Sequence, residues 1–188
     1  GGPCMSGLRL DTAQLPGAIA QLRAGDRVLL SGTIYTARDA AHKRIFELLD
    51  QGRPLPFELR GAVIYYAGPT PGQQGMAVGA CGPTTAGRMD AFAPRLLDLG
   101  LAAMIGKGGR ASEVVDAIVR NGACYFAAVG GAGALIARCI RSARVIAFDD
   151  LGCESVKRME VEDLPLTVAI DSRGGDLFRL GPAQYRED

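Results

Sequence analysis

The sequence has no excess of charge, a single histidine and no tryptophan. With 21 basic and 20 acidic residues the net charge is +1, which gives no general attraction to nucleic acid or to an anionic membrane. The five cysteines are an odd number, and none has C-x-x-C spacing, which argues against a disulfide scaffold and a self-contained zinc site. The long uncharged stretch 124–137 is too short and too rich in glycine to span a bilayer.

What is present suits an ordinary globular protein. The 188 residues, 48% hydrophobic and 22% charged, predict one domain over 1–188, with a core over about 8–178 and a polar tail over 179–188. The opening residues have neither a basic segment nor an apolar one, so we expect no signal peptide and a cytoplasmic protein.

Apolar runs alternate with amphipathic stretches along the chain. The apolar spacing of Ala41, Ile45, Leu48 and Leu49 predicts a helix that Thr36 caps, with Asp39 in a capping-box position. A second stripe predicts a helix ending near Gly100. Further helices are expected over 112–122 and 132–140, and strands within 26–36, 61–72, 101–109, 123–131, 143–150 and 155–174.

This alternation favours an α/β fold with a mostly parallel central sheet flanked by helices. Ligands of such sheets bind where strands end and helices begin. The loops 36–39, 79–88 and 106–112 occupy such places, and they carry Arg38, Thr84, Arg88 and Lys107.

The string GPTTAGRMD, residues 82–90, predicts a loop in which Thr84 or Thr85 caps a helix. Arg88 would then lie in the first helical turn, where backbone N–H groups attract anions. The alternative is a well-capped helix with a surface arginine. Two arginines with a lysine also suit a clamp for a small dicarboxylate, and a threonine hydroxyl beside them can orient substrate or pass a proton.

Other features of the sequence are weaker. The segment VGGAGAL, with Asp149 beyond it, is an incomplete dinucleotide fingerprint, and GKGG does not have the spacing of a P-loop. His42 falls beside the apolar stripe of its helix, so the helical pattern alone favours a solvated histidine.

Several strings together resemble one family. SGTIYTARDAAHKR (31–44), YYAGPTPG (65–72), GPTTAGRMD (82–90), GKGG (106–109) and VEDLP (161–165) are similar to the β subunit of two-subunit, iron–sulfur-dependent hydro-lyases. These are class I fumarases and L(+)-tartrate dehydratases, and the same unit forms the C-terminal domain of single-chain class I fumarases. The resemblance implies a swivelling β/β/α fold.

The resemblance also implies roles for individual residues. Arg38 and Arg88 would bind substrate carboxylates, and Lys107 would be a further substrate contact. Thr84 would transfer the proton at the reacting carbon, and His42 would act in acid–base chemistry or orient Arg38 and Asp39. Asp39 and Asp90 are expected to hold these groups in position without contacting the substrate. No residue of this chain is expected to bind metal.

The family places a [4Fe-4S] cluster on a partner α subunit, whose open iron binds the substrate, so each unit contributes half of the active site. We therefore expect an α-subunit partner, a small dicarboxylate substrate and a homodimer or heterotetramer. Fumarate to malate is favoured; L(+)-tartrate dehydration and a non-catalytic dicarboxylate-binding module are the alternatives. Ala37 and the string GCESV, 152–156, depart from the family pattern, which leaves the substrate open.

Overall fold

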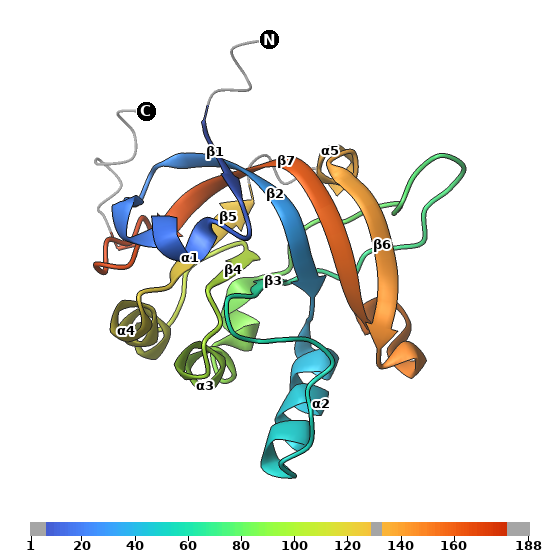
Figure 1. Ribbon diagram of the computed structural model, residues 1–188, viewed down its shortest axis with the longest axis horizontal. Coiled ribbons are helices and arrows are strands. Elements are labelled where there is room, and N and C mark those ends of the chain that lie inside the picture. The colour runs from blue at the N-terminus through green and yellow to red at the C-terminus, as the bar shows by residue number, and fades with distance from the viewer. Residues whose placement is uncertain (1–6, 129–132, 180–188) are drawn as a thin grey trace.

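The computed structural model describes residues 7–128 and 133–179 (Figure 1). Helices and strands alternate along most of the chain, as the apolar pattern predicts. The strands are β1 (Leu8–Asp11), β2 (Arg27–Thr36), β3 (Val63–Tyr65), β4 (Ala103–Gly106), β5 (Cys124–Ala128), β6 (Ile140–Ala147) and β7 (Val156–Ile170). The α-helices are α1 (Leu15–Ala18), α2 (Asp39–Asp50), α3 (Ala93–Asp98), α4 (Ser112–Asn121) and α5 (Gly133–Ala137), and the 3-10 helices are η2 (Ile19–Gln21), η3 (Ala86–Met89) and η4 (Asp149–Glu154).

The sheet is mixed rather than mostly parallel, which corrects the prediction. The pairs β1–β2, β2–β3, β3–β4 and β4–β5 are parallel, whereas β7 is antiparallel to β2, β5 and β6. The cause is the length of β7: its 15 residues reach β2 along one edge and both β5 and β6 along the other. As a result β2, β3, β4, β5 and β7 form a closed ring, with β1 and β6 attached outside it.

The ring bends at an irregularity between β2 and β7. Leu30 pairs with Leu164 but Gly32 pairs with Val161, so β7 carries an extra residue there. Asp163 takes the left-handed conformation, with φ 50°, and Gly32 has φ 116°. A Cβ atom on Gly32 would lie 2.3 Å from Thr12 Oγ1, so this position requires glycine. Such bulges increase local twist and allow a sheet to curve.

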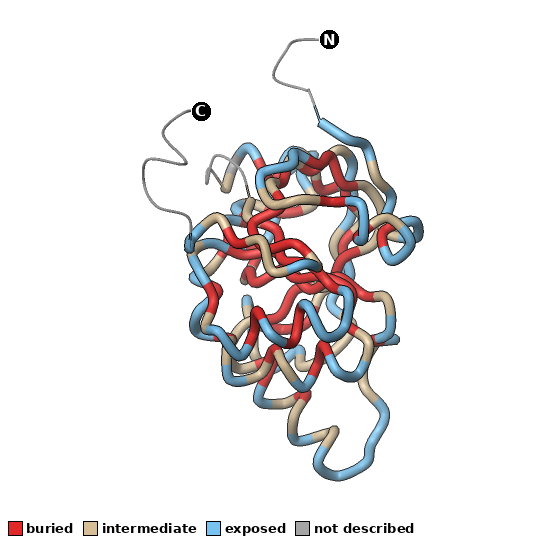
Figure 2. The backbone as a smooth tube through the Cα atoms, turned by 90° about the vertical axis from the view of Figure 1, so that its left-hand side faces the viewer, coloured by how far each residue is buried: buried red, intermediate tan, exposed pale blue. Residues whose placement is uncertain are grey.

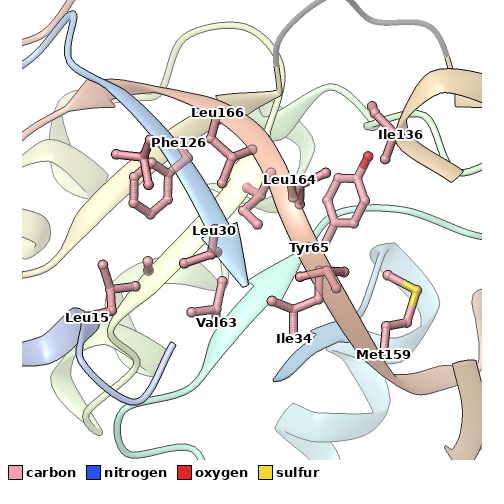
Figure 3. Close-up of a cluster of buried hydrophobic side chains, with 14 of the residues drawn as sticks. Leu15, Leu30, Ile34, Val63, Tyr65, Phe126, Ile136, Met159, Leu164 and Leu166 are labelled. Atoms are coloured by element: carbon pink, nitrogen blue, oxygen red, sulfur yellow. The ribbon is translucent and has the colours of Figure 1, made fainter. Parts of the chain in front are cut away.

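The closed ring separates two apolar clusters. The interior cluster includes Leu30, Val63 and Phe126, which converge with Leu15 of α1 in Figure 3. The exterior cluster lies between the ring and helices α2, α3 and α4, and Figure 2 shows buried residues running through the middle of the molecule. The strands of the ring lie between the two clusters, so both of their faces are buried, which explains their continuous apolar runs.

The predicted helix starts are partly wrong. Thr36 does not cap α2: its hydroxyl accepts a hydrogen bond from the Lys157 backbone at 3.1 Å, and Arg38 occupies the cap position. Thr85 precedes η3, a 3-10 helix of 4 residues, and makes no capping hydrogen bond. Arg88 therefore does not lie at the start of an α-helix, and no α-helix terminus contributes to anion binding at this residue.

The structure confirms the predicted helix α4 but does not describe every predicted segment. Helix α4 starts at Ser112 and ends before Gly122, which takes the left-handed conformation at φ 62°, close to prediction. Most of the suspected dinucleotide loop and nearly all of the polar tail 179–188 lie outside the described residues. No helix among the described residues is long and apolar enough to cross a bilayer.

Candidate active site

Three chain segments meet at the carboxyl ends of β2, β3 and β4. The strand ends are level, because Thr36 pairs with Tyr65 and Tyr65 pairs with Ile105. The long loop after β3 returns to this edge: the Thr84 N–H donates to the Tyr66 carbonyl at 2.7 Å. The edge therefore gathers the loops that carry Arg38, Thr84, Arg88 and Lys107, as the sheet pattern predicts.

Thr84 and Lys107 are held together through their backbones. The Lys107 N–H donates to the Thr84 carbonyl at 3.3 Å, and the Ala86 N–H donates to the Lys107 carbonyl at 2.8 Å. Thr84 is half-buried and Lys107 is exposed. Within residues 7–128 and 133–179, neither side chain has a hydrogen-bond partner, so the hydroxyl and the ammonium are both free for a ligand.

Arg88 forms an ion pair with Asp39, the first residue of α2. The arginine side chain is 61% exposed and the aspartate 27% exposed. This pair connects the loop after β3 to the helix after β2. A ligand carboxylate that approaches Arg88 competes with Asp39 for the guanidinium, at low cost because exposed pairs contribute little to stability.

Arg38 is held by Glu154, a residue that the sequence reasoning did not select. Arg38 Nη2 lies 3.7 Å from Glu154 Oε2, while Glu154 Oε1 accepts from the Ala40 N–H at 3.2 Å. The guanidinium lies against Gly68, where a Cβ atom would come within 2.8 Å of Arg38 Cζ. The signal for Glu154 was the string GCESV, which was noted only as a departure from the family pattern.

His42 is buried rather than solvated, which corrects the expectation from the helical pattern. Its ring lies beside the rings of Tyr66 and Phe92, with centroids 5.7 and 5.3 Å away. Burial lowers the pKa of His42 to about 4, so the ring is neutral near pH 7. Nδ1 lies 2.8 Å from the Arg38 carbonyl and must donate to it, which leaves Nε2 unprotonated. This contact fits an orienting action on the Arg38 backbone.

Asp90 and Arg110 form a buried ion pair beneath the site. Arg110 Nε donates to Asp90 Oδ1 at 2.7 Å, and the other aspartate oxygen accepts from the Ala111 N–H at 2.8 Å. The arginine side chain is fully enclosed, between the rings of Tyr66 and Tyr125. The pair thus fixes the loop after β3 to the loop after β4.

Asp90 was expected to support the site, and Arg110 was missed. In the string GKGGR an arginine after several glycines looks like a loop residue, and only the three-dimensional contact with Asp90 reveals its burial.

The four cysteines that the structure describes do not form a ligand set for an iron–sulfur cluster. Cys81 and Cys124 are buried, Cys139 is half-buried and Cys153 is exposed. Among the described residues no group of at least 3 cysteine, histidine or acidic side chains could hold a metal ion. Burial raises the pKa of Cys81 to about 12, which keeps this thiol protonated although it lies near the site loops.

The fold and these loops define a mixed α/β protein with a cationic edge at the carboxyl ends of adjacent parallel strands. Comparison with known proteins defines it further: the chain belongs to the family described as the fumarase C-terminus, whose model matches residues 5–181.

Named relatives fall into two kinds. The chain is 40% identical over 162 residues to Fumarate hydratase 2 of Leishmania major, and 38% identical over 163 residues to the aerobic class I fumarate hydratase of Escherichia coli K12. These matches cover 85% and 86% of this chain but only 28% and 30% of the relatives. The Putative L(+)-tartrate dehydratase subunit beta of Methanocaldococcus jannaschii is 38% identical over 166 residues, with 85% of each chain covered.

Proposed function

We propose that this chain is the β subunit of an iron–sulfur-dependent hydro-lyase that reversibly hydrates a small dicarboxylate, with fumarate to malate as the favoured reaction. Family membership and relatives called fumarate hydratases support the reaction class. The observation that carries the proposal for this chain is that the loops with Arg38, Thr84, Arg88 and Lys107 gather at one sheet edge.

The chemistry of the three cationic side chains suggests how they would bind substrate and stabilise charge. Arg38 and Arg88 bind the two substrate carboxylates, because guanidinium groups match carboxylates in a bidentate way. Lys107, whose backbone N–H donates to the Thr84 carbonyl, is proposed to add a third positive charge. Fixed positive groups stabilise the negative charge that develops when a proton leaves the carbon beside a carboxylate.

Thr84 is proposed to carry the proton at the reacting carbon. Its hydroxyl has no partner among the described residues, and Lys107 beside it lowers the cost of the deprotonated form. His42 is proposed as a positioning residue that fixes Arg38 through the Arg38 carbonyl, and an acid–base action of its Nε2 is the alternative. Asp39 and Asp90 hold Arg88 and the loop after β4 in place.

The cluster is proposed to belong to a partner. The described cysteines of this chain do not form a ligand set, and the fumarate hydratases that match it are more than three times longer than the matched part. The match to a β subunit over 85% of each chain supports assembly with a separate α subunit, and a homodimer or heterotetramer is proposed. The chain itself is proposed to be one swivelling β/β/α domain with its core over about 8–178.

Reconstitution tests the proposal. The chain is expressed together with a family α subunit and purified without oxygen, and hydration of fumarate and dehydration of L-malate and L(+)-tartrate are assayed. We expect fumarate and malate to interconvert faster than tartrate reacts. A faster reaction of tartrate would indicate a tartrate dehydratase instead. A complex that holds its full cluster but is inactive would indicate a non-catalytic dicarboxylate-binding module.

A further inference from the structure

Beside the candidate active site, a pocket lies between the loop after β3 and the strand β6. In Figure 1 this loop is the green segment that extends past β6. The pocket has a volume of about 390 Å³ and apolar walls for the most part. None of the four predicted substrate-binding residues lines it. The lining includes Pro71, Val78, Ala143, Val145, Asp149 and Lys157.

Lys157 brings an ammonium group to the end of the interior cluster. It pairs with Val145 in the sheet, and Met159, two positions further along β7, pairs with Ala143 and belongs to the interior cluster. Residues two apart on a strand share a face, so Lys157 lies on the face that covers the apolar interior. The pocket is therefore a continuation of the interior cluster that opens to solvent at this lysine.

The Lys157 ammonium has only neutral partners. Nζ donates to the Cys153 carbonyl at 3.2 Å and to Ser155 Oγ at 2.9 Å. Across residues 7–128 and 133–179, no carboxylate forms an ion pair with it. Burial lowers the pKa of Lys157, and the charge of nearby Arg38 lowers that pKa further. An ammonium in such surroundings is a binding group for an anion.

Lys157 differs from two other cations, Arg110 and Arg38, because each of these arginines has a carboxylate partner. Arg110 is buried more deeply than the half-buried Lys157, but Asp90 pairs with it at 2.7 Å. Arg38, partly exposed, has Glu154. Removing a cation from water without a counter-charge costs free energy that a bound anion would offset. Lys157 lacks such a counter-charge in the described chain, and it has an open pocket beside it.

We propose that this pocket binds a small monocarboxylate, whose carboxylate pairs with Lys157 and whose short aliphatic part lies against Ala143, Val145 and Pro71. Asp149 also lines the pocket and repels a second carboxylate, so a dicarboxylate of the kind proposed for the active site is disfavoured here. Such binding next to Arg38 would place a second ligand within reach of the substrate-binding loops.

Titration of the 15N-labelled full chain with butanoate tests this proposal. We expect saturable shifts of the amide signals of Ala143, Val145 and Cys153. Lys157→Met should weaken butanoate at least about tenfold, because a hydrogen bond to a charged group contributes about 1.5–3 kcal/mol. Lys157→Arg, which keeps the charge, should stay within about threefold of the wild type. Lys43→Met, at an exposed helix position, should have no effect.

Two further probes separate this site from general anion binding. Butan-1-ol, which lacks the charge, and succinate, which adds a second one, should each bind at least about tenfold more weakly than butanoate at this pocket. Val145→Trp fills the pocket at a residue that is 41% exposed, so it should abolish the shifts while Lys157 is still present. Equal binding to the wild type and Lys157→Met, no saturable shift, or equal binding of succinate would overturn the proposal.

Discussion

Two arginine–aspartate pairs start from neighbouring positions of one short 3-10 helix, Arg88 within η3 and Asp90 directly after it, and they differ in almost every physical respect. Asp90 faces inward to an enclosed Arg110, whereas Arg88 faces outward to Asp39 and is 61% exposed. The inward pair also binds the Ala111 N–H and lies between two tyrosine rings. The Asp90–Arg110 pair is thus enclosed and fixes the loop, whereas the Arg88–Asp39 pair is exposed, and we propose that a ligand anion can replace Asp39 there.

The largest effect is expected from breaking the inward pair. Asp90→Ala leaves the Arg110 guanidinium enclosed without a counter-charge, so the free energy of unfolding should fall by about 3–5 kcal/mol. Denaturant unfolding of the chain measures it. In a double-mutant cycle, adding Arg110→Met should recover part of this loss, and purely additive effects would show that the two side chains do not stabilise one another.

The next effect concerns the histidine beneath Arg38. Because the folded-state pKa of His42 is about 4 and the ordinary value is 6.5, the unfolded chain binds more protons between these pH values. Stability is therefore fully present above pH 6.5 and is lost as pH falls to about 4, by about 3 kcal/mol. His42→Asn keeps a donor near the Arg38 carbonyl but does not titrate, so its unfolding free energy should change much less over this range. An unchanged pH profile would contradict the burial of a neutral ring.

The smallest effect is expected from breaking the outward pair. Asp39→Ala should change the free energy of unfolding by about 1 kcal/mol or less, because exposed ion pairs contribute little. It nevertheless removes the partner of Arg88, so the affinity of the proposed complex for the proposed dicarboxylate should change while the fold does not. Parallel unfolding curves for Asp39→Ala and Asp90→Ala measure the difference directly, and equal losses would remove the distinction between the two pairs.

The sequence predicted local structure well and long-range closure poorly. The β-branched and aliphatic composition located β2, and apolar periodicity located α2 and α4, to within a few residues, because each of these helices buries one face against the sheet. It did not predict the mixed sheet, because no local sequence pattern determines that β7 lies antiparallel to β2. More than a hundred residues of sequence separate these two strands.

The candidate site shows the same division. Arg38, Thr84, Arg88 and Lys107 could be selected as candidates because each follows a predicted strand, and strand ends of a sheet gather ligands. Glu154 and Arg110 were missed because their importance comes from contacts across the fold. His42 was misjudged because α2 is covered on more than one side, by Tyr66 and by Phe92, which a single helical stripe does not reveal.

The most direct test of the central claim is the kcat/KM of the assembled enzyme for fumarate with Arg88→Ala, beside Arg95→Ala as a matched control. Arg95, in α3, forms another exposed pair with Asp50, the last residue of α2. We predict a loss of about tenfold to a hundredfold for Arg88→Ala, with the free energy of unfolding unchanged within about 1 kcal/mol, and no loss for Arg95→Ala. Equal kcat/KM values for the two variants would contradict a carboxylate site at this edge of the sheet.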